Sequence, residues 1–326
     1  MKVLVSIQQP VHQWQIPADG VARLRQRFPD VEFIHATSDE QRAAGLTDCD
    51  VAYTWILKAA EAAAAEQLRW VHTSAVAVET ICLPELFARH IPVSNSRGVQ
   101  AVPIAEHVMA VVLALAKQLP FALHHQRVAR WVQNEFTGPR IPWLLKGRTL
   151  GVIGVGTIGA EIAARANAFG MRVMAMRRRS TQPVDGIERI FGGEQLDQFL
   201  SQCHVLVIAA PLTPQTHSLL GAPQFAQLPK GAIVVNVGRA KIVDTDALMG
   251  ALESGHLGGA SLDVFPLEPL PPEHRLWKMP NVILTPHTSG FRQGHWDEVV
   301  DLFADNLDRF RRGEALRFRV EPDLGY

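Results

Sequence analysis

Cysteine is scarce in this chain. The 326 residues include three cysteines, Cys49, Cys82 and Cys203, and no two of them stand in C-x-x-C spacing. An odd, scattered set of this kind excludes a disulfide framework and is typical of proteins in a reducing compartment. The adjacent His124 and His125 lack a third ligand at a useful spacing, so we expect no metal site. These features predict a cytoplasmic protein.

An excess of charge of either sign is also lacking. Lysine plus arginine and aspartate plus glutamate both number 32, which gives a formal net charge of +0. A balanced chain has no global attraction for nucleic acids or for an anionic membrane surface. We therefore expect neither of them as a partner.

Long apolar runs are absent as well. The longest, 108–116, is too short to cross a bilayer, and the N-terminal MKVLVSI is too short and too quickly polar for a signal peptide. The hydrophobic fraction of 47% and the charged fraction of 20% are those of globular proteins. At 326 residues the chain is long enough for two domains, each with its own core.

A cluster of glycines organises the sequence. The segment 148–180 predicts a strand, a tight turn, a helix and a second strand, and the turn has G-x-G-x-x-G spacing. In such a turn Gly154 permits the sharp bend, Gly156 lets the backbone approach a pyrophosphate, and Gly159 lets the helix pack against the strand. The flanking strand and helix distinguish this pattern from a flexible glycine loop. We therefore predict a dinucleotide site.

The end of the second strand indicates which dinucleotide binds. In NAD sites an acidic residue about twenty positions after the glycines accepts a hydrogen bond from the ribose. Here Met176 is followed by Arg177, Arg178 and Arg179, and no carboxylate is present among them. Guanidinium groups bind a 2′-phosphate through bidentate, charge-assisted hydrogen bonds, which favours NADP. The alternative is a solvated basic turn that contacts no ligand.

Strand and helix patterns alternate through the N-terminal part of the chain. Strands are predicted at 3–7, 31–34, 51–54, 70–74 and 93–95, and helices at 18–28 and 59–68. This alternation predicts a parallel sheet covered by helices. An apolar helix is predicted at 102–119, and the irregular segment between it and the glycine turn is interpreted as a dimerisation arm. The last helix, 297–312, is predicted to return to the first domain.

Ionisable residues follow several of the later strands. These strands are predicted at 205–209, 233–237, 260–264 and 282–284. Because the carboxyl ends of parallel strands line the ligand crevice, Arg239, Asp263, Glu268 and His287 are expected on the same edge as the glycine turn.

These side chains suit the reduction of a 2-keto acid. Arg239 can bind the carboxylate and polarise the ketone, His287 can donate a proton to the oxygen, and Glu268 can stabilise the imidazolium. Taken singly, the arginine could be a surface charge and the histidine a turn residue. Their common edge makes the catalytic interpretation the better one.

Motifs along nearly the whole chain resemble those of the D-isomer-specific 2-hydroxyacid dehydrogenases, which include glyoxylate/hydroxypyruvate reductases and phosphoglycerate dehydrogenase. The motifs are NSRGVQAVPIAEH at 95–107, GVIGVGTIG at 151–159, APLTPQT at 210–216, NVGRA at 236–240, LDVFPLEPLP at 262–271 and NVILTPHTSG at 281–290. The resemblance implies an α/β protein with a flavodoxin-like substrate domain, 1–101 and 291–326, and a Rossmann NAD(P)-binding domain, 102–290. It also implies a homodimer.

The resemblance further implies site residues. The catalytic residues implied are Arg239, Glu268 and His287. Those implied at the cofactor are Gly154, Gly156, Thr157, Ile158, Gly159, Arg177, Arg178, Arg179, Ala210, Pro211, Thr216, Val237, Gly238, Arg239, Asp263, His287, Ser289 and Gly290. Those implied at the substrate are Val76, Ala77, Arg239 and His287.

Two departures from the family pattern bear on specificity. Arg177 stands where an acidic residue is usual, and the loop 74–79 has alanines and valines where relatives commonly have glycine. We expect an NADPH-preferring reductase that converts small 2-keto acids, such as glyoxylate or hydroxypyruvate, to D-2-hydroxy acids, without a C-terminal regulatory domain. The alternatives are a phosphoglycerate dehydrogenase and a dinucleotide-sensing protein of the corepressor type, which shares the fold and the catalytic residues.

Overall fold

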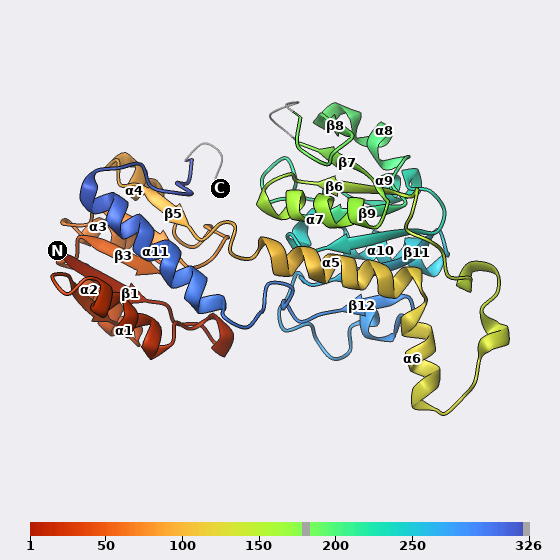
Figure 1. Ribbon diagram of the computed structural model, residues 1–326, viewed down its shortest axis with the longest axis horizontal. Helices are drawn as coiled ribbons and strands as arrows, with labels where there is room; N and C mark the ends of the chain where they lie inside the picture. The colour runs from red at the N-terminus through yellow and green to blue at the C-terminus, as the bar shows by residue number, and fades with distance from the viewer. Residues whose placement is uncertain (178–182, 322–326) are drawn as a thin grey trace. The chain divides into compact units, whose positions relative to one another are not determined.

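Two parallel β-sheets organise the structure, one in each of two units. The computed structural model describes residues 1–177 and 183–321. The first unit comprises Met1–Gln100 and Phe291–Tyr326, and the second comprises Ala101–Gly290 (Figure 1). The first boundary between the two units follows Gln100, one residue before the boundary expected from the sequence.

The first unit has the strand order β2-β1-β3-β4-β5, which is that of flavodoxin-like folds, as expected. Its strands are β1 (Lys2–Ser6), β2 (Glu32–His35), β3 (Val51–Thr54), β4 (Trp70–Thr73) and β5 (Val93–Asn95). Its helices are α1 (Ala18–Arg27), α2 (Asp39–Leu46), α3 (Ala59–Ala64), α4 (Pro84–Ala88), α11 (His295–Arg312) and the short η1 (His12–Trp14).

Side chains that alternate along the strands build an apolar layer on each face of this sheet. Val3 and Val5 pack with residues of α1 and α11, whereas Leu4 packs with residues of α2, α3 and α4. On the α11 side the ring of Phe303 stacks on Tyr53, with centroids 4.1 Å apart. The C-terminal helix therefore completes the core of the N-terminal sheet, as its prediction required.

A buried histidine in β4 has a defined protonation state. Ser96 Oγ donates its only proton to the carbonyl of Thr73 (3.0 Å), so it accepts from His72 Nε2 (3.3 Å). The neutral ring then accepts from Ser94 Oγ at Nδ1 (2.7 Å), while Ser94 accepts from Trp70 Nε1 (2.9 Å). Complete burial lowers the pKa of His72 from 6.5 to about 3.

We expect acid to destabilise the protein through His72. In the unfolded chain the imidazole of His72 binds a proton below about pH 6.5. In the folded chain it stays neutral until the pH falls to its pKa of about 3. Stability is therefore lost as the pH falls through 6.5 toward 3, and His72 accounts for about 2 kcal/mol at pH 5. Urea unfolding at pH 7 and pH 5 measures the loss. His72→Asn should lose about 2 kcal/mol less over this range, and equal losses would contradict the assignment.

The second unit is a Rossmann-type sheet in the order β12-β11-β10-β9-β6-β7-β8. Its strands are β6 (Thr149–Ile153), β7 (Arg172–Met176), β8 (Arg189–Phe191), β9 (Val205–Ile208), β10 (Ala232–Asn236), β11 (Leu257–Leu262) and β12 (Val282–Leu284). Its helices are α5 (Ala101–Ala116), α6 (Leu119–Arg127), α7 (Thr157–Ala168), α8 (Leu196–Leu200), α9 (Ala222–Gln227) and α10 (Thr245–Glu253). Its short 3-10 helices are η2 (Gln133–Glu135), η3 (Gly138–Arg140), η4 (Gly193–Gln195), η5 (Ala240–Ile242) and η6 (Arg275–Lys278). The strand order reverses between β6 and β9, where open α/β sheets bind ligands.

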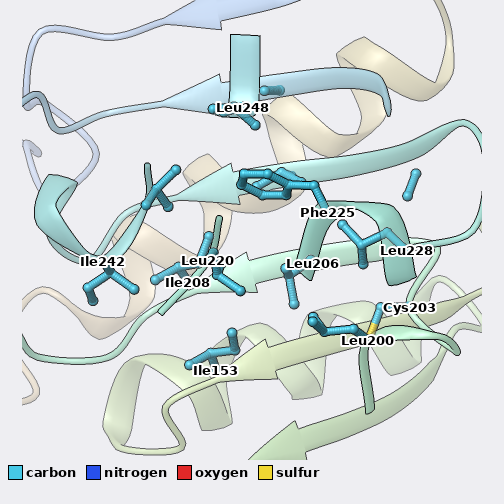
Figure 2. Packing of buried hydrophobic residues seen from close by; sticks show 14 of the residues in the cluster. Ile153, Leu200, Cys203, Leu206, Ile208, Leu220, Phe225, Leu228, Ile242 and Leu248 are labelled. Atoms are coloured by element: carbon cyan, nitrogen blue, oxygen red, sulfur yellow. The ribbon is translucent and has the colours of Figure 1, made fainter. Parts of the chain in front are cut away.

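Each face of the second sheet is covered by its own group of helices. Residues of α5 and α7 share one apolar cluster with β6, β9 and β10, and residues of α8, α9 and α10 share another. Figure 2 shows part of the second cluster, in which Leu206 and Ile208 of β9 lie among Phe225 of α9 and Leu248 of α10. The sheet is therefore covered on both faces, and a ligand can approach at the ends of its strands.

The helix predicted at 102–119 ends earlier than expected. The segment that follows it, which was expected to be irregular, begins with a second helix. The first helix ends at Ala116, Gln118 takes a left-handed conformation (φ +58°), and α6 begins at Leu119 with Pro120 in its first turn. Proline fits a first helical turn because no intrahelical donor is needed there. Among the described residues no single helix is long and apolar enough to cross a membrane, although α5 and α6 pass that test as a pair bent by 71°.

Candidate dinucleotide and catalytic site

The turn between β6 and α7 requires glycine because other backbone lies against it. Gly154 has φ +94°, and a Cβ on it would lie 2.7 Å from Ala210 Cα. A Cβ on Gly159 would lie 2.5 Å from the carbonyl oxygen of Gly154. At Gly156, by contrast, a Cβ would meet no described heavy atom within 4 Å. The turn is closed toward the protein and open where a pyrophosphate would approach.

The helix that starts at this turn fits a phosphate group. α7 has Gly156 as its N-cap, and the amides of Thr157, Ile158 and Gly159 belong to its first turn. First-turn amides have no intrahelical acceptor, and the helix dipole is positive at this end. These residues therefore suit the pyrophosphate of a dinucleotide.

Arg177 follows the last residue of β7 at the same edge of the sheet. Its backbone amide donates to the carbonyl of Phe191 (3.0 Å), and its side chain is partly buried. Arg178 and Arg179, which were predicted with it, lie outside the described residues. A guanidinium thus stands where an acidic residue would mark an NAD site.

The loops after β9 and β10 meet beside the glycine turn. Thr216 Oγ1 donates to the carbonyl of Pro211 (2.8 Å), which ties together the loop that begins at Ala210. A Cβ on Gly238 would lie 2.8 Å from the carbonyl oxygen of Ala210. Val237, just before this glycine, is buried. The predicted cofactor residues of three loops are therefore neighbours.

Arg239 leaves the sheet edge directly after this contact. Asn236 Nδ2 donates to its carbonyl (3.2 Å), and Arg239 Nη1 donates to the carbonyl of Gly238 (2.9 Å). The side chain is partly buried. These bonds fix the direction in which the guanidinium leaves β10.

Glu268 and His287 form a hydrogen-bonded pair. Glu268 Oε2 lies 2.9 Å from His287 Nδ1, and Glu268 Oε1 accepts from the amide of Phe265 (2.9 Å). The side chains are 39% and 51% exposed, so solutes can reach them. Because Nδ1 faces the carboxylate, Nε2 is the nitrogen that can present a proton to a ligand.

Asp263, which follows the last residue of β11, is buried rather than exposed at the edge of the sheet. Its carboxylate binds the amide and the hydroxyl of Ser289, the amide of Thr288 and the hydroxyl of Thr285. Gly290 follows Ser289, and both are buried. Sequence reasoning did not single out Thr285 or Thr288, although both flank the histidine in LTPHTSG, because local pattern does not show where the hydroxyl of Thr285 or the amide of Thr288 points.

Val76 and Ala77 belong to the first unit, where they follow β4 and are partly exposed. Asn95 Nδ2 donates to the carbonyl of Val76 (2.7 Å), and the amide of Ser96 donates to the carbonyl of Ala75 (3.0 Å). The loop is therefore held to the start of the segment after β5.

The fold and the site define a dinucleotide-dependent oxidoreductase. Residues 109–289 match the family described as D-isomer specific 2-hydroxyacid dehydrogenase, NAD binding domain. A glyoxylate reductase of Korarchaeum cryptofilum is 31% identical over 95% of this chain and 93% of its own. One of Thermococcus kodakarensis is 34% identical over 92% of each chain. The chain belongs to the D-isomer specific 2-hydroxyacid dehydrogenase family.

Solved structures agree with this assignment along the whole length. The NADPH-dependent glyoxylate/hydroxypyruvate reductase of Sinorhizobium meliloti, in complex with NADP and sulfate, superposes with a TM-score of 0.84 at 26% identity. The match covers 100% of this chain and 99% of that one. A family member from Xanthobacter autotrophicus, in complex with NADPH and MES, gives 0.83 at 29% identity over 100% and 99%.

Proposed function

We propose that this enzyme is an NADPH-preferring reductase of small 2-keto acids such as glyoxylate or hydroxypyruvate, which it converts to D-2-hydroxy acids. The observation that carries the proposal is the Glu268–His287 pair, at 2.9 Å, on the same sheet edge as Arg239 and the glycine turn. A proton donor, a carboxylate-binding group and a dinucleotide turn are what this reaction requires.

Each side chain has a separate task in the proposed reaction. Arg239 binds the substrate carboxylate and polarises the ketone. His287 donates the Nε2 proton to the ketone oxygen, and Glu268 orients the ring and stabilises its cationic form. Bound NADPH supplies the hydride that the carbonyl carbon receives. Val76 and Ala77 contact the substrate from a loop that Asn95 holds in place.

Purified protein incubated with NADPH and a panel of keto acids tests this function. The panel contains glyoxylate, hydroxypyruvate, pyruvate, phenylpyruvate and phosphohydroxypyruvate, and NADPH oxidation is followed by absorbance. We expect turnover with the small members. Turnover only with phosphohydroxypyruvate would indicate a phosphoglycerate dehydrogenase. No turnover with any of them would favour a dinucleotide-sensing protein.

NADPH should be used at least about tenfold more efficiently than NADH, because one charge-assisted phosphate contact supplies about 1.5 kcal/mol or more. Among the described residues, Arg177 is the one that we expect to bind the 2′-phosphate of NADPH. The ratio of kcat/KM for the two cofactors, measured in the wild type and in Arg177→Ala, provides the test. Arg172→Ala, which removes an exposed arginine paired with Glu188 at the start of β7, is the matched control and should keep the preference. An unchanged ratio in Arg177→Ala would refute this role.

We also propose that the enzyme is a cytoplasmic homodimer. Several apolar side chains on α6 and the segment after it are exposed, among them Leu123, Val128, Trp131 at 88% and Leu144 at 71%. Exposed apolar side chains are stabilised when a second copy of the chain covers them. The thiols of Cys49 and Cys203 are buried, which suits a reducing compartment. Sedimentation equilibrium tests the assembly, and a monomer at micromolar concentration would contradict it.

A further inference from the structure

Asp263 places both of its carboxylate oxygens on the segment that carries His287. Oδ1 accepts from Thr285 Oγ1 (2.6 Å), from the amide of Thr288 (2.9 Å) and from that of Ser289 (3.2 Å). Oδ2 accepts from the amide (3.1 Å) and the hydroxyl of Ser289. The residue is 1% exposed. A buried carboxylate is tolerated only when hydrogen bonds replace its hydration, and here the donors come from Thr285, Thr288 and Ser289.

These bonds hold a backbone conformation that a histidine rarely adopts. His287 has φ +55°, in the left-handed region that favours glycine. Its amide closes a tight turn on the carbonyl of Thr285 (2.9 Å). Such a conformation persists only where neighbouring contacts determine it, and Asp263 binds the two amides that follow. The same conformation brings the ring nitrogen to Glu268.

Thr285 links this carboxylate to helix α5. A hydroxyl has one proton, and Thr285 donates it to Asp263. The contact between Thr285 Oγ1 and His107 Nε2 (3.4 Å) therefore has the imidazole as its donor. Burial lowers the pKa of His107, although the charge of Asp263 opposes this, so its neutral ring carries the proton on Nε2. The donors run in one direction, from His107 through Thr285 to Asp263.

We propose that Thr285, oriented by His107, is a positioning residue that aims the Asp263 carboxylate and thereby holds His287 in its left-handed turn against Glu268. The inference rests on the proposed role of His287 as proton donor. It assigns to Thr285 no contact with the substrate. Its hydroxyl acts through the geometry of the turn.

Thr285→Val and Thr285→Ser separate the hydroxyl from the shape of the side chain. Valine keeps the branched shape without the donor, and serine keeps the donor. We expect Thr285→Val to lower kcat by about 10- to 100-fold, since displacement of a catalytic group by about 1 Å has effects of this size. NADPH affinity, measured by fluorescence titration, should stay nearly unchanged. Thr285→Ser should recover most of kcat.

Amide hydrogen exchange of peptides that span 285–290 gives a readout independent of turnover. Protection of the Thr288 and Ser289 amides should fall in Thr285→Val and return in Thr285→Ser. An unchanged kcat in Thr285→Val, whatever the exchange shows, would overturn the positioning role. If the wild type reduces no keto acid, the proposed function fails. Full protection of the Thr288 and Ser289 amides in Thr285→Val would then overturn, without any measurement of turnover, the proposal that Thr285 holds the turn.

Discussion

His287→Ala should lower kcat/KM for keto acid reduction by about 10²- to 10⁴-fold, the range that general acids contribute. The ketone oxygen gains negative charge as the carbonyl carbon is reduced, and without the imidazolium the proposed proton donor to this oxygen is lost. Glu268 Oε2 lies 2.9 Å from Nδ1, so Nε2 is directed toward the reaction. Initial rates over a range of keto acid concentrations at saturating NADPH measure the loss, and NADPH affinity should remain nearly as in the wild type.

Glu268→Gln is the matched control for the histidine. It keeps the shape and a hydrogen bond to His287 but removes the negative charge that stabilises the imidazolium. The loss of kcat/KM should be smaller than in His287→Ala, because the amide can still hold the ring although it no longer offsets its positive charge. A Glu268→Gln variant as active as the wild type, with His287 still essential, would show that the carboxylate charge does not contribute.

Arg239→Met should lower kcat/KM by about 10²- to 10³-fold, because a charge-assisted donor to a developing oxyanion is worth about 3 to 4 kcal/mol. The side chain leaves β10 beside Gly238, whose carbonyl accepts from Arg239 Nη1 (2.9 Å). Both KM for the keto acid and kcat should change, since the guanidinium binds the carboxylate and also polarises the ketone. The measurement is a full substrate titration at saturating NADPH.

Arg239→Lys distinguishes charge from geometry. Lysine keeps the positive charge but lacks the planar fork that binds a carboxylate through two parallel hydrogen bonds. We expect the lysine variant to lie between the wild type and the methionine variant. A lysine variant as active as the wild type would show that Arg239 acts only as a point charge. A fully active methionine variant would remove Arg239 from the site.

Periodic patterns predicted much of the second unit because they are local. Short apolar runs, the glycine spacing and the arginine after β7 depend on residues close in sequence, and the structure places them as the pattern indicated. The common edge of Arg239, Glu268 and His287 followed from one further rule, that parallel strands end on the same side. β8 (Arg189–Phe191) was not predicted because three residues are too few for a periodic signal.

By itself the sequence determined the two α/β units, the glycine turn and the identity of the ionisable residues at the strand ends. Only the tertiary structure decided that α5 stops at Ala116, that Asp263 turns inward to bind Thr285 and Ser289, and that His287 adopts a positive φ. These features depend on contacts between segments far apart in the chain, such as β11 with the turn after β12. A hydrogen bond between such segments has no periodic trace in the sequence, because its direction is set by packing rather than by neighbouring residues.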